Sequence, residues 1–131
     1  MKKLLLLLSI ITLSFAAPSW EDDFEYALES AKEDKKLVLL MFSSQTCKVC
    51  KYMKTKVYPD KSVSAFITDN FIPVEVDINE YPDAFGYKVF GTPTYYFLTS
   101  EGQVIGDAMI GGAKADAFLQ KLKDVKNASK K

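Results

Sequence analysis

Both cysteines of this 131-residue chain lie in one stretch, Phe42-Ser43-Ser44-Gln45-Thr46-Cys47-Lys48-Val49-Cys50-Lys51. The continuous apolar run 37–42 leads into it and predicts a buried strand, and segment 51–58 predicts a helix that leads away. The N-terminus of a helix carries partial positive charge and free N–H groups, which stabilise a thiolate at the first cysteine. Two intervening residues allow the sulfurs to bond within one turn, so the stretch predicts a redox-active dithiol.

Two other roles for the cysteine pair remain open. A purely structural disulfide would add little stability here, because the stabilisation grows with the length of the closed loop. A zinc site needs about four ligands, whereas the chain offers two thiols and no histidine, so a partner would have to complete the site. The absence of histidine also excludes Ser–His and Cys–His catalysis. We therefore expect redox chemistry and no bound metal.

Residues 1–16 have the pattern of a cleavable export signal. Lys2 and Lys3 precede an apolar stretch that is shorter than the roughly 20 residues needed to span a bilayer. Ser14 and Ala16 place small residues at the −3 and −1 positions for cleavage after Ala16. We expect an exported protein, with an uncleaved N-terminal anchor as the alternative.

The remaining chain, residues 17–131, has the length of one domain. It contains 15 lysines, no arginine and 17 acidic residues, so it has no basic field that would hold nucleic acid. We expect a single domain, with a frayed polar tail at 126–131, and no nucleic-acid partner.

Apolar periodicity predicts the other elements. A helix is expected from Ser19, with Trp20 on its apolar stripe, and Pro59 should end the helix that follows the cysteines. Continuous apolar character in 37–42 is typical of a central strand covered on both faces, which implies a mixed or parallel sheet between helices. The further elements expected are helix 63–70, strand 71–78, a short helix at 81–87, a hairpin of 94–99 with a strand from 104, and helix 114–125.

Glu75 places a carboxylate in the middle of the otherwise apolar strand 71–78. Two interpretations stay open from the pattern alone. The strand lies at a sheet edge and Glu75 is simply solvated, or the carboxylate has a chemical role.

Two motifs resemble those of the thioredoxin-like superfamily. One is Cys47-Lys48-Val49-Cys50 after an apolar strand, and the other is Val89-Phe90-Gly91-Thr92-Pro93-Thr94, which resembles the loop with the family's cis-proline. The resemblance covers residues 20–125 and is closest to periplasmic thioredoxin-related proteins of bacteria, of the SoxW-like and thiol:disulfide interchange kind. It implies the α/β thioredoxin fold, a central mixed sheet flanked by helices on both faces, and a periplasmic location.

The resemblance also implies roles for individual residues. Cys47 would be the nucleophile, Cys50 the resolving thiol, and Pro93 a cis-proline that leaves the Thr92 backbone free to pair with an extended substrate. No cofactor is implied beyond the Cys47–Cys50 disulfide itself. The residues expected to contact substrate are Thr46, Lys48, Val49, Phe90, Thr92 and Pro93.

The chain departs from thioredoxins proper at three points. Thr46 replaces their tryptophan, and Lys48-Val49 replaces their Gly-Pro. The family's buried aspartate, six residues before the first cysteine, falls on Met41. Our hypothesis is that Glu75 takes over proton transfer to and from Cys50.

Taken together, these features predict an exported monomeric enzyme that exchanges disulfides with protein substrates. A role as reductant, recharged by a membrane redox partner, is favoured because the chain lacks the inserted helical domain of the disulfide-forming oxidases. The alternatives are a disulfide oxidase or isomerase, a binding or chaperone module with the same fold, and a carrier of a soft ion such as Cu(I).

Overall fold

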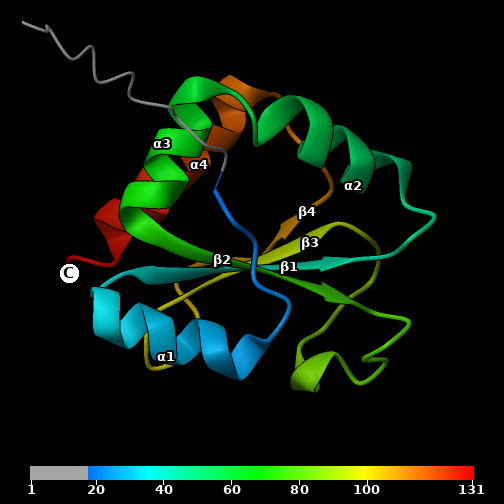
Figure 1. Ribbon diagram of the computed structural model, residues 1–131, viewed down its shortest axis with the longest axis horizontal. Helices are drawn as coiled ribbons and strands as arrows, with labels where there is room; N and C mark the ends of the chain where they lie inside the picture. The colour runs from blue at the N-terminus through cyan, green and yellow to red at the C-terminus, as the bar shows by residue number, and fades with distance from the viewer. Residues whose placement is uncertain (1–17) are drawn as a thin grey trace, which may run out of the picture.

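Strand β1 (Leu37–Ser43) lies inside a four-stranded sheet in the computed structural model, which describes residues 18–131. It runs parallel to β2 (Phe71–Asp77) and antiparallel to β3 (Thr94–Leu98), which pairs with β4 (Met109–Ile110). The strand order is therefore β2-β1-β3-β4 (Figure 1). The predicted mixed sheet with residues 37–42 at its centre is confirmed.

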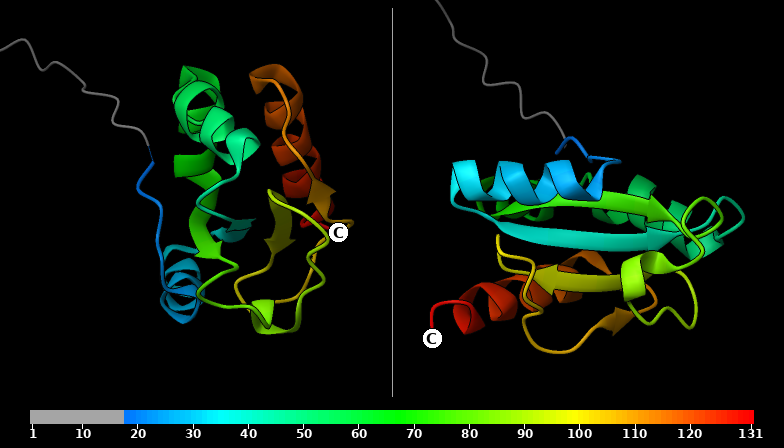
Figure 2. Two further views of the ribbon diagram at one scale, coloured as in Figure 1. Left: turned by 90° about the vertical axis from the view of Figure 1, so that its right-hand side faces the viewer. Right: turned by 90° about the horizontal axis from the view of Figure 1, so that it is seen from below.

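Helices cover both faces of the sheet, as Figure 1 and the left view of Figure 2 show. Helix α1 (Phe24–Asp34) lies on one face, while α2 (Lys48–Tyr52), α3 (Lys61–Asn70) and α4 (Ala115–Ala128) lie on the other. Side chains alternate along a strand, so β1 contributes to two separate cores. Leu39 and Met41 belong to the core under α2–α4, and Val38, Leu40 and Phe42 to the core under α1. This two-sided burial explains why β1 shows no polar alternation.

The first helix begins at Phe24, and the prediction that it starts near Ser19 is wrong. The Asp23 carboxylate accepts a hydrogen bond from the N–H of Tyr26 and so caps the helix. Such a side-chain acceptor satisfies an N–H of the first turn that has no partner inside the helix. The acidic residues before Asp23 are therefore outside α1.

Trp20 lies in the extended segment before α1 and not on its apolar stripe. In this segment the N–H of Glu21 donates to the carbonyl of Pro73, and the Glu21 carbonyl accepts from the N–H of Glu75, each at 2.9 Å. The segment thus runs beside the outer edge of β2. The Trp20 ring stacks on Tyr58, with ring centroids 4.5 Å apart, in the core under α2–α4.

The helix after the cysteines is not uniform. After α2 the chain forms one π-helical segment, η1 (Met53–Val57), in which the N–H of Tyr58 donates to the carbonyl of Met53 at 2.9 Å. Met53, Val57 and Tyr58 are all buried. Pro59 follows directly, as predicted, and α3 then begins behind an Asp60 cap.

The hairpin after β3 is shorter than predicted. A single bridge pairs Leu98 with Val104, and β4 starts only at Met109. Gly106 between them has a φ of +67°, which turns the chain away from extended geometry. The short 3-10 helix η2 (Ala84–Gly86) confirms the helical turn expected at 81–87.

Helix α4 is longer than predicted. It buries Phe118, Leu122 and Val125 and continues to Ala128, so only residues 129–131 follow it and the predicted tail from 126 is corrected. The expected export signal, residues 1–16, lies outside the described residues. Within 18–131 no helix has the length and apolarity needed to cross a membrane.

Gly112, just after β4, allows the chain to contact the cysteine helix closely. A Cβ atom at this position would lie 2.7 Å from Cγ1 of Val49 and 3.3 Å from Sδ of Met53. The neighbouring N–H of Ala113 donates to the same Met53 sulfur at 3.5 Å. The turn after β4 therefore packs against α2 and η1 and helps to hold the cysteines in place.

We predict that Gly112→Ala lowers the free energy of unfolding by about 1–2 kcal/mol, because the new methyl group must displace Val49 in a packed contact. Urea unfolding of the oxidised protein measures this change. Gly91→Ala is the matched control, since a Cβ there meets no atom within 4 Å and should change stability by less than about 1 kcal/mol. Equal effects of the two substitutions would show that the contact does not constrain α2.

Candidate functional site: a disulfide at the start of α2

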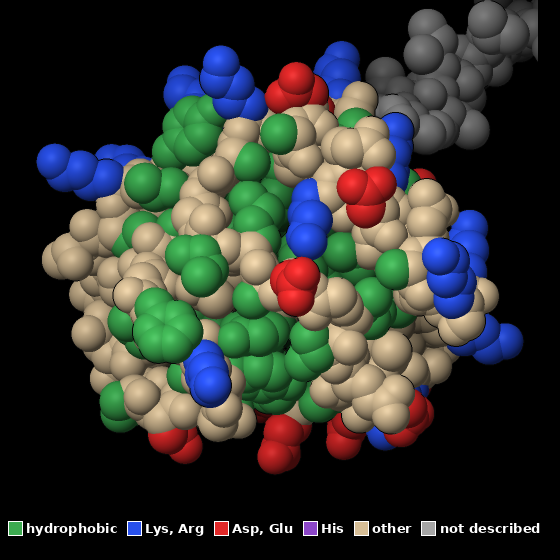
Figure 3. Space-filling model, turned by 180° about the vertical axis from the view of Figure 1, so that it is seen from behind, with side chains coloured by type: hydrophobic (Ala, Val, Ile, Leu, Met, Phe, Trp, Pro, Cys, Tyr) green, Lys and Arg blue, Asp and Glu red, His purple; other side chains and the backbone are tan. Residues whose placement is uncertain are grey.

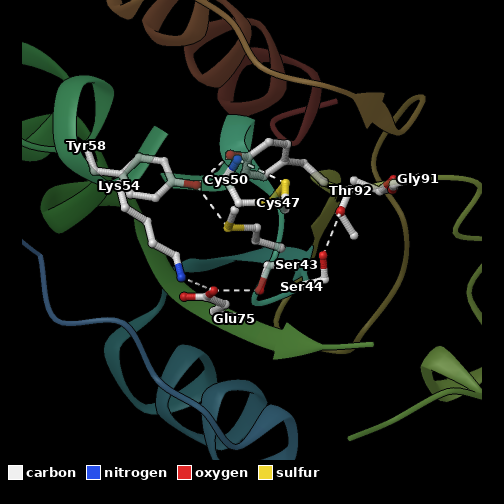
Figure 4. Close-up of a disulfide and its surroundings, with 12 residues drawn as sticks. Ser43, Ser44, Cys47, Cys50, Lys54, Tyr58, Glu75, Gly91 and Thr92 are labelled. Carbon is white, nitrogen blue, oxygen red and sulfur yellow. Dashed lines mark hydrogen bonds and ion pairs between the residues drawn. A yellow bond between two sulfur atoms is a disulfide. The ribbon is translucent and has the colours of Figure 1, made fainter. Parts of the chain in front are cut away.

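A disulfide joins Cys47 and Cys50 at the start of α2, with their Cα atoms 5.3 Å apart (Figure 4). Cys47 is the N-cap residue, and its sulfur accepts a hydrogen bond of 3.1 Å from the N–H of Cys50. Cys47 is partly exposed, whereas Cys50 is 2% exposed. A reagent from solvent therefore reaches the sulfur of Cys47 first.

The turn between β1 and α2 sets this geometry. The N–H of Cys47 donates to the carbonyl of Ser44 at 3.2 Å, and the Cys47 carbonyl accepts from the N–H of Lys51 at 3.2 Å. These bonds start the helix at the first cysteine and direct a backbone N–H at its sulfur.

The loop before β3 is held beside this turn. Its Thr92–Pro93 peptide bond is cis. The Thr92 and Ser44 hydroxyl oxygens lie 3.3 Å apart, and the Pro93 carbonyl accepts from the N–H of Gly111 at 2.8 Å. Within residues 18–131 no hydrogen bond uses the Thr92 backbone, so its N–H and carbonyl are available to another chain.

The other residues predicted to contact substrate are at the surface. Thr46 and Lys48 are exposed, Val49 is 43% exposed, and Phe90, two residues before Thr92, is 83% exposed. A phenylalanine this exposed does not contribute to the core. Of the residues predicted to contact substrate, these four are therefore exposed, Thr92 is partly buried, and Pro93 is buried.

Glu75 is neither simply solvated nor bonded to a cysteine. Strand β2 does form a sheet edge, but the Glu75 side chain is only 24% exposed and forms an ion pair with Lys54. It also accepts a hydrogen bond of 2.6 Å from the Ser43 hydroxyl, and Met41 is its register partner on β1. Among the described residues no hydrogen bond joins Glu75 to Cys50, as Figure 4 illustrates.

A cleft of about 350 Å³ opens beside Glu75. The β1–α2 turn, through Ser43 to Gln45, forms one wall, and acidic side chains form much of the rest. Water in this cleft has access to the Glu75 carboxylate. The acidic residues that line it are Glu21, Asp22, Glu75, Asp77 and Glu80.

Two buried tyrosines form a polar pair near Cys50 that the sequence patterns did not predict. The Tyr58 hydroxyl lies 2.5 Å from the Tyr95 hydroxyl and 3.0 Å from Sδ of Met41. Tyr58, Tyr95, Met41 and Cys50 belong to one buried cluster. Figure 4 shows the Tyr58 hydroxyl directed toward Cys50. The Tyr58 hydroxyl contacts the Met41 sulfur and the Tyr95 hydroxyl, so tyrosine hydroxyls are polar groups in this part of the core. The sequence pattern predicted only a helix that includes Tyr58 and a strand that includes Tyr95.

Burial raises the pKa of both Tyr58 and Tyr95 well above the usual tyrosine value. In the folded protein both phenols stay protonated at pH values where an unfolded chain ionises them. Their contribution to stability is therefore complete below about pH 10 and is lost as the pH rises above that value.

We predict that the free energy of unfolding falls above about pH 10, by about 1.4 kcal/mol per pH unit for each buried tyrosine. Tyr58→Phe removes one of these groups and should make the slope shallower by that amount. Urea unfolding at several alkaline pH values measures both slopes. Tyr26→Phe, at a residue 54% exposed, should keep the wild-type slope, and a wild-type slope for Tyr58→Phe would contradict the assignment.

Comparison with known proteins places the chain in a family. The thioredoxin-like domain family matches residues 24–126. Thioredoxin H3 of Arabidopsis thaliana is 32% identical over 107 residues, which cover 79% of this chain and 86% of that protein. The thiol:disulfide interchange protein DsbD of Vibrio vulnificus is 27% identical over 112 residues, which cover 81% of this chain. The chain spans only 9–19% of the length of the first curated relatives, DsbD among them.

Solved structures agree in fold. A thioredoxin from Thermus thermophilus superimposes with a TM-score of 0.74 at 27% identity, covering 85% of this chain and 88% of that one. The structure of DsbH oxidoreductase gives 0.68 at 27% identity, covering 84% and 85%. The chain belongs to the thioredoxin-like family.

Proposed function

We propose that this protein is exported and reduces disulfides in other proteins. The observation that carries the proposal is the asymmetry of the cysteine pair, since Cys47 is open to a partner and Cys50 is buried directly behind it. This arrangement separates the sulfur that attacks from the sulfur that resolves. The sequence of residues 1–16, which lie outside the described part, supports export to the periplasm.

The reaction transfers two electrons in two exchanges. The Cys47 thiolate attacks one sulfur of a substrate disulfide, which forms a mixed disulfide and releases the first substrate thiolate. Cys50 then loses its proton and attacks the Cys47 sulfur, which releases the second substrate thiolate and closes the Cys47–Cys50 disulfide. The substrate is reduced and the dithiol is oxidised, without a metal or an added cofactor.

Substrate binding in this proposal uses the surface around Cys47. The unpaired N–H and carbonyl of Thr92 would hydrogen-bond an extended substrate segment, next to the cis Pro93. Exposed side chains near Cys47 and Thr92 would contact the side chains of the substrate. These residues are Thr46, Lys48, Val49 and Phe90.

Similarity and chain length support the proposed direction of electron flow. DsbD is a thiol:disulfide interchange protein, and its similarity covers most of this chain. Only 43 positions separate Cys50 from Pro93, which leaves no room for an inserted helical domain. A reductant in the periplasm needs a supply of electrons, so a membrane redox partner would restore the dithiol after each cycle.

We predict a reduction potential near that of thioredoxin, about −270 mV, and turnover in an insulin-reduction assay with dithiothreitol as electron donor. Equilibration of the protein with defined dithiothreitol mixtures gives the potential. A value near about −120 mV would mark an oxidant instead. A cysteine pair that binds a soft metal ion stoichiometrically and never turns over would favour a carrier.

The two single-cysteine variants are the controls for this experiment. Cys50→Ser should accumulate a mixed disulfide between Cys47 and insulin, because the resolving thiol is missing. Cys47→Ser should form no such adduct, and both variants should lose turnover. An adduct through Cys50 would contradict the assigned order of attack.

Glu75 is proposed as the group that takes and returns the Cys50 proton. Its carboxylate is held by Ser43 and Lys54 at the wall of a cleft that admits water. Since Glu75 does not touch Cys50, the transfer would pass through water in this cleft. General acid–base catalysis of this kind contributes about 10²–10⁴-fold to a rate.

We predict that Glu75→Gln slows closure of the Cys47–Cys50 disulfide at least about tenfold and flattens its pH dependence. Rapid acid quenching of the mixed disulfide, followed by alkylation and mass spectrometry, measures the closure rate at each pH. Asp77→Asn removes the same charge from the same cleft and should keep the wild-type pH profile. An unchanged profile for Glu75→Gln would exclude the role in proton transfer.

A further inference from the structure

Lysines dominate the helix that carries the disulfide. Segment 43–59 contains four lysines and no acidic residue, although the whole chain has no net charge. All four are exposed, and only Lys54 has an ion-pair partner, Glu75, in the described part of the chain. Lys51 follows Cys47 by one helical turn, so its charge lies close to the reactive sulfur.

Two other segments approach the cysteine helix and its turn. Segment 89–94 has no charged residue; its Thr92 hydroxyl lies 3.3 Å from that of Ser44, and its Phe90 is exposed. Segment 108–115 contains Lys114 and no acid, and its Gly112 approaches Val49 of α2. Lys114 is exposed.

Many acidic residues lie across the β1–α2 turn from α2. Segment 21–34, which includes α1 on the opposite face of the sheet, has seven acidic residues and one lysine. The turn residues Ser43–Gln45 line the acidic cleft, whereas Lys48 and Lys51 do not. Figure 3 shows acidic side chains along the lower edge of the far face, and both lysines and acidic side chains above them.

Apolar side chains stand among the lysines. Val49, Phe90 and Ile110 are 43%, 83% and 63% exposed. An apolar centre with a charged rim is the composition of a protein-binding surface. We define the docking face as Val49, Phe90 and Ile110 together with Lys48, Lys51 and Lys114.

We infer that the docking face selects protein partners whose cysteines are surrounded by acidic residues. The inference rests on the proposed function and names its partner class. Charge complementarity around a reacting disulfide accelerates encounter and orients the partner. With lysines on the α2 side and carboxylates across the turn, a partner gains electrostatic energy only when its acidic side faces α2. A partner with lysines around its disulfide is repelled from the same face.

The probe for this inference is a pair of disulfide-bridged peptides that are identical except that glutamates flank the cysteines in one and lysines in the other. Reduced wild-type protein is mixed with each peptide, and the second-order exchange rate is followed by rapid quenching. At about 10 mM salt the glutamate peptide should react at least about tenfold faster, and at about 0.5 M salt the ratio should approach one, because salt screens the charges.

Two double variants that change the net charge equally locate the effect. Lys51→Glu with Lys114→Glu should abolish or reverse the preference for the glutamate peptide. Lys123→Glu with Lys126→Glu alters the groove between the ends of α3 and α4, near the C-terminus and remote from α2 (Figure 1), and should keep it. Circular dichroism confirms that each variant is folded.

Three outcomes distinguish a failure of the docking-face inference from a failure of the proposed oxidoreductase function. A preference that is salt-sensitive and lost only in the Lys51/Lys114 variant supports the docking face. Equal rates for the two peptides, or the same loss in the control variant, overturn the docking face and leave the oxidoreductase function intact. Failure of the wild-type dithiol to reduce either peptide or insulin overturns the proposed function together with the inference.

Discussion

The hydrogen bond from the N–H of Cys50 to the sulfur of Cys47 is the contact on which the rest of the site depends. It exists because α2 begins at Cys47, so the first free N–H groups of the helix meet the sulfur. That start requires β1 to end at Ser43 and the chain to turn within a few residues. The same geometry leaves Cys47 at the surface and buries Cys50, and the two sulfurs therefore differ in accessibility.

Burial of β1 on both faces makes this placement rigid. Two hydrophobic cores, one under α1 and one under α2–α4, meet at the strand that leads to the cysteines. The core under α2–α4 contains the hydroxyl groups of Tyr58 and Tyr95. They hydrogen-bond to each other, and the Tyr58 hydroxyl also donates to the Met41 sulfur, in a region from which solvent is excluded. Buried polar groups are tolerated when they are paired. Here the two hydroxyls pair with each other in the cluster that also contains Cys50.

Charge is distributed as unevenly as burial. The net charge of zero conceals local differences, since segment 43–59, which contains the disulfide, has four lysines and no acidic residue, whereas segment 21–34 has seven acidic residues and one lysine. Glu75 and Lys54 form the one described ion pair that crosses from β2 to the cysteine helix. This contact ties the acidic cleft to the segment that follows the cysteines.

Local periodicity and motifs of a few residues were enough to predict several features from the amino-acid sequence. These features are strand β1, the cysteine pair, the proline loop, a sheet covered on both faces and the closing helix. The contacts of Trp20, Tyr58, Tyr95 and Glu75 became known only from the tertiary structure. Trp20 was expected on α1, but the backbone of Glu21 pairs with the open edge of β2 and carries the ring to the opposite core. The tyrosine pair and the Glu75–Lys54 pair join residues distant in sequence. These residues become neighbours only when the folded sheet brings their segments together. A pattern within one segment therefore does not predict the pairing.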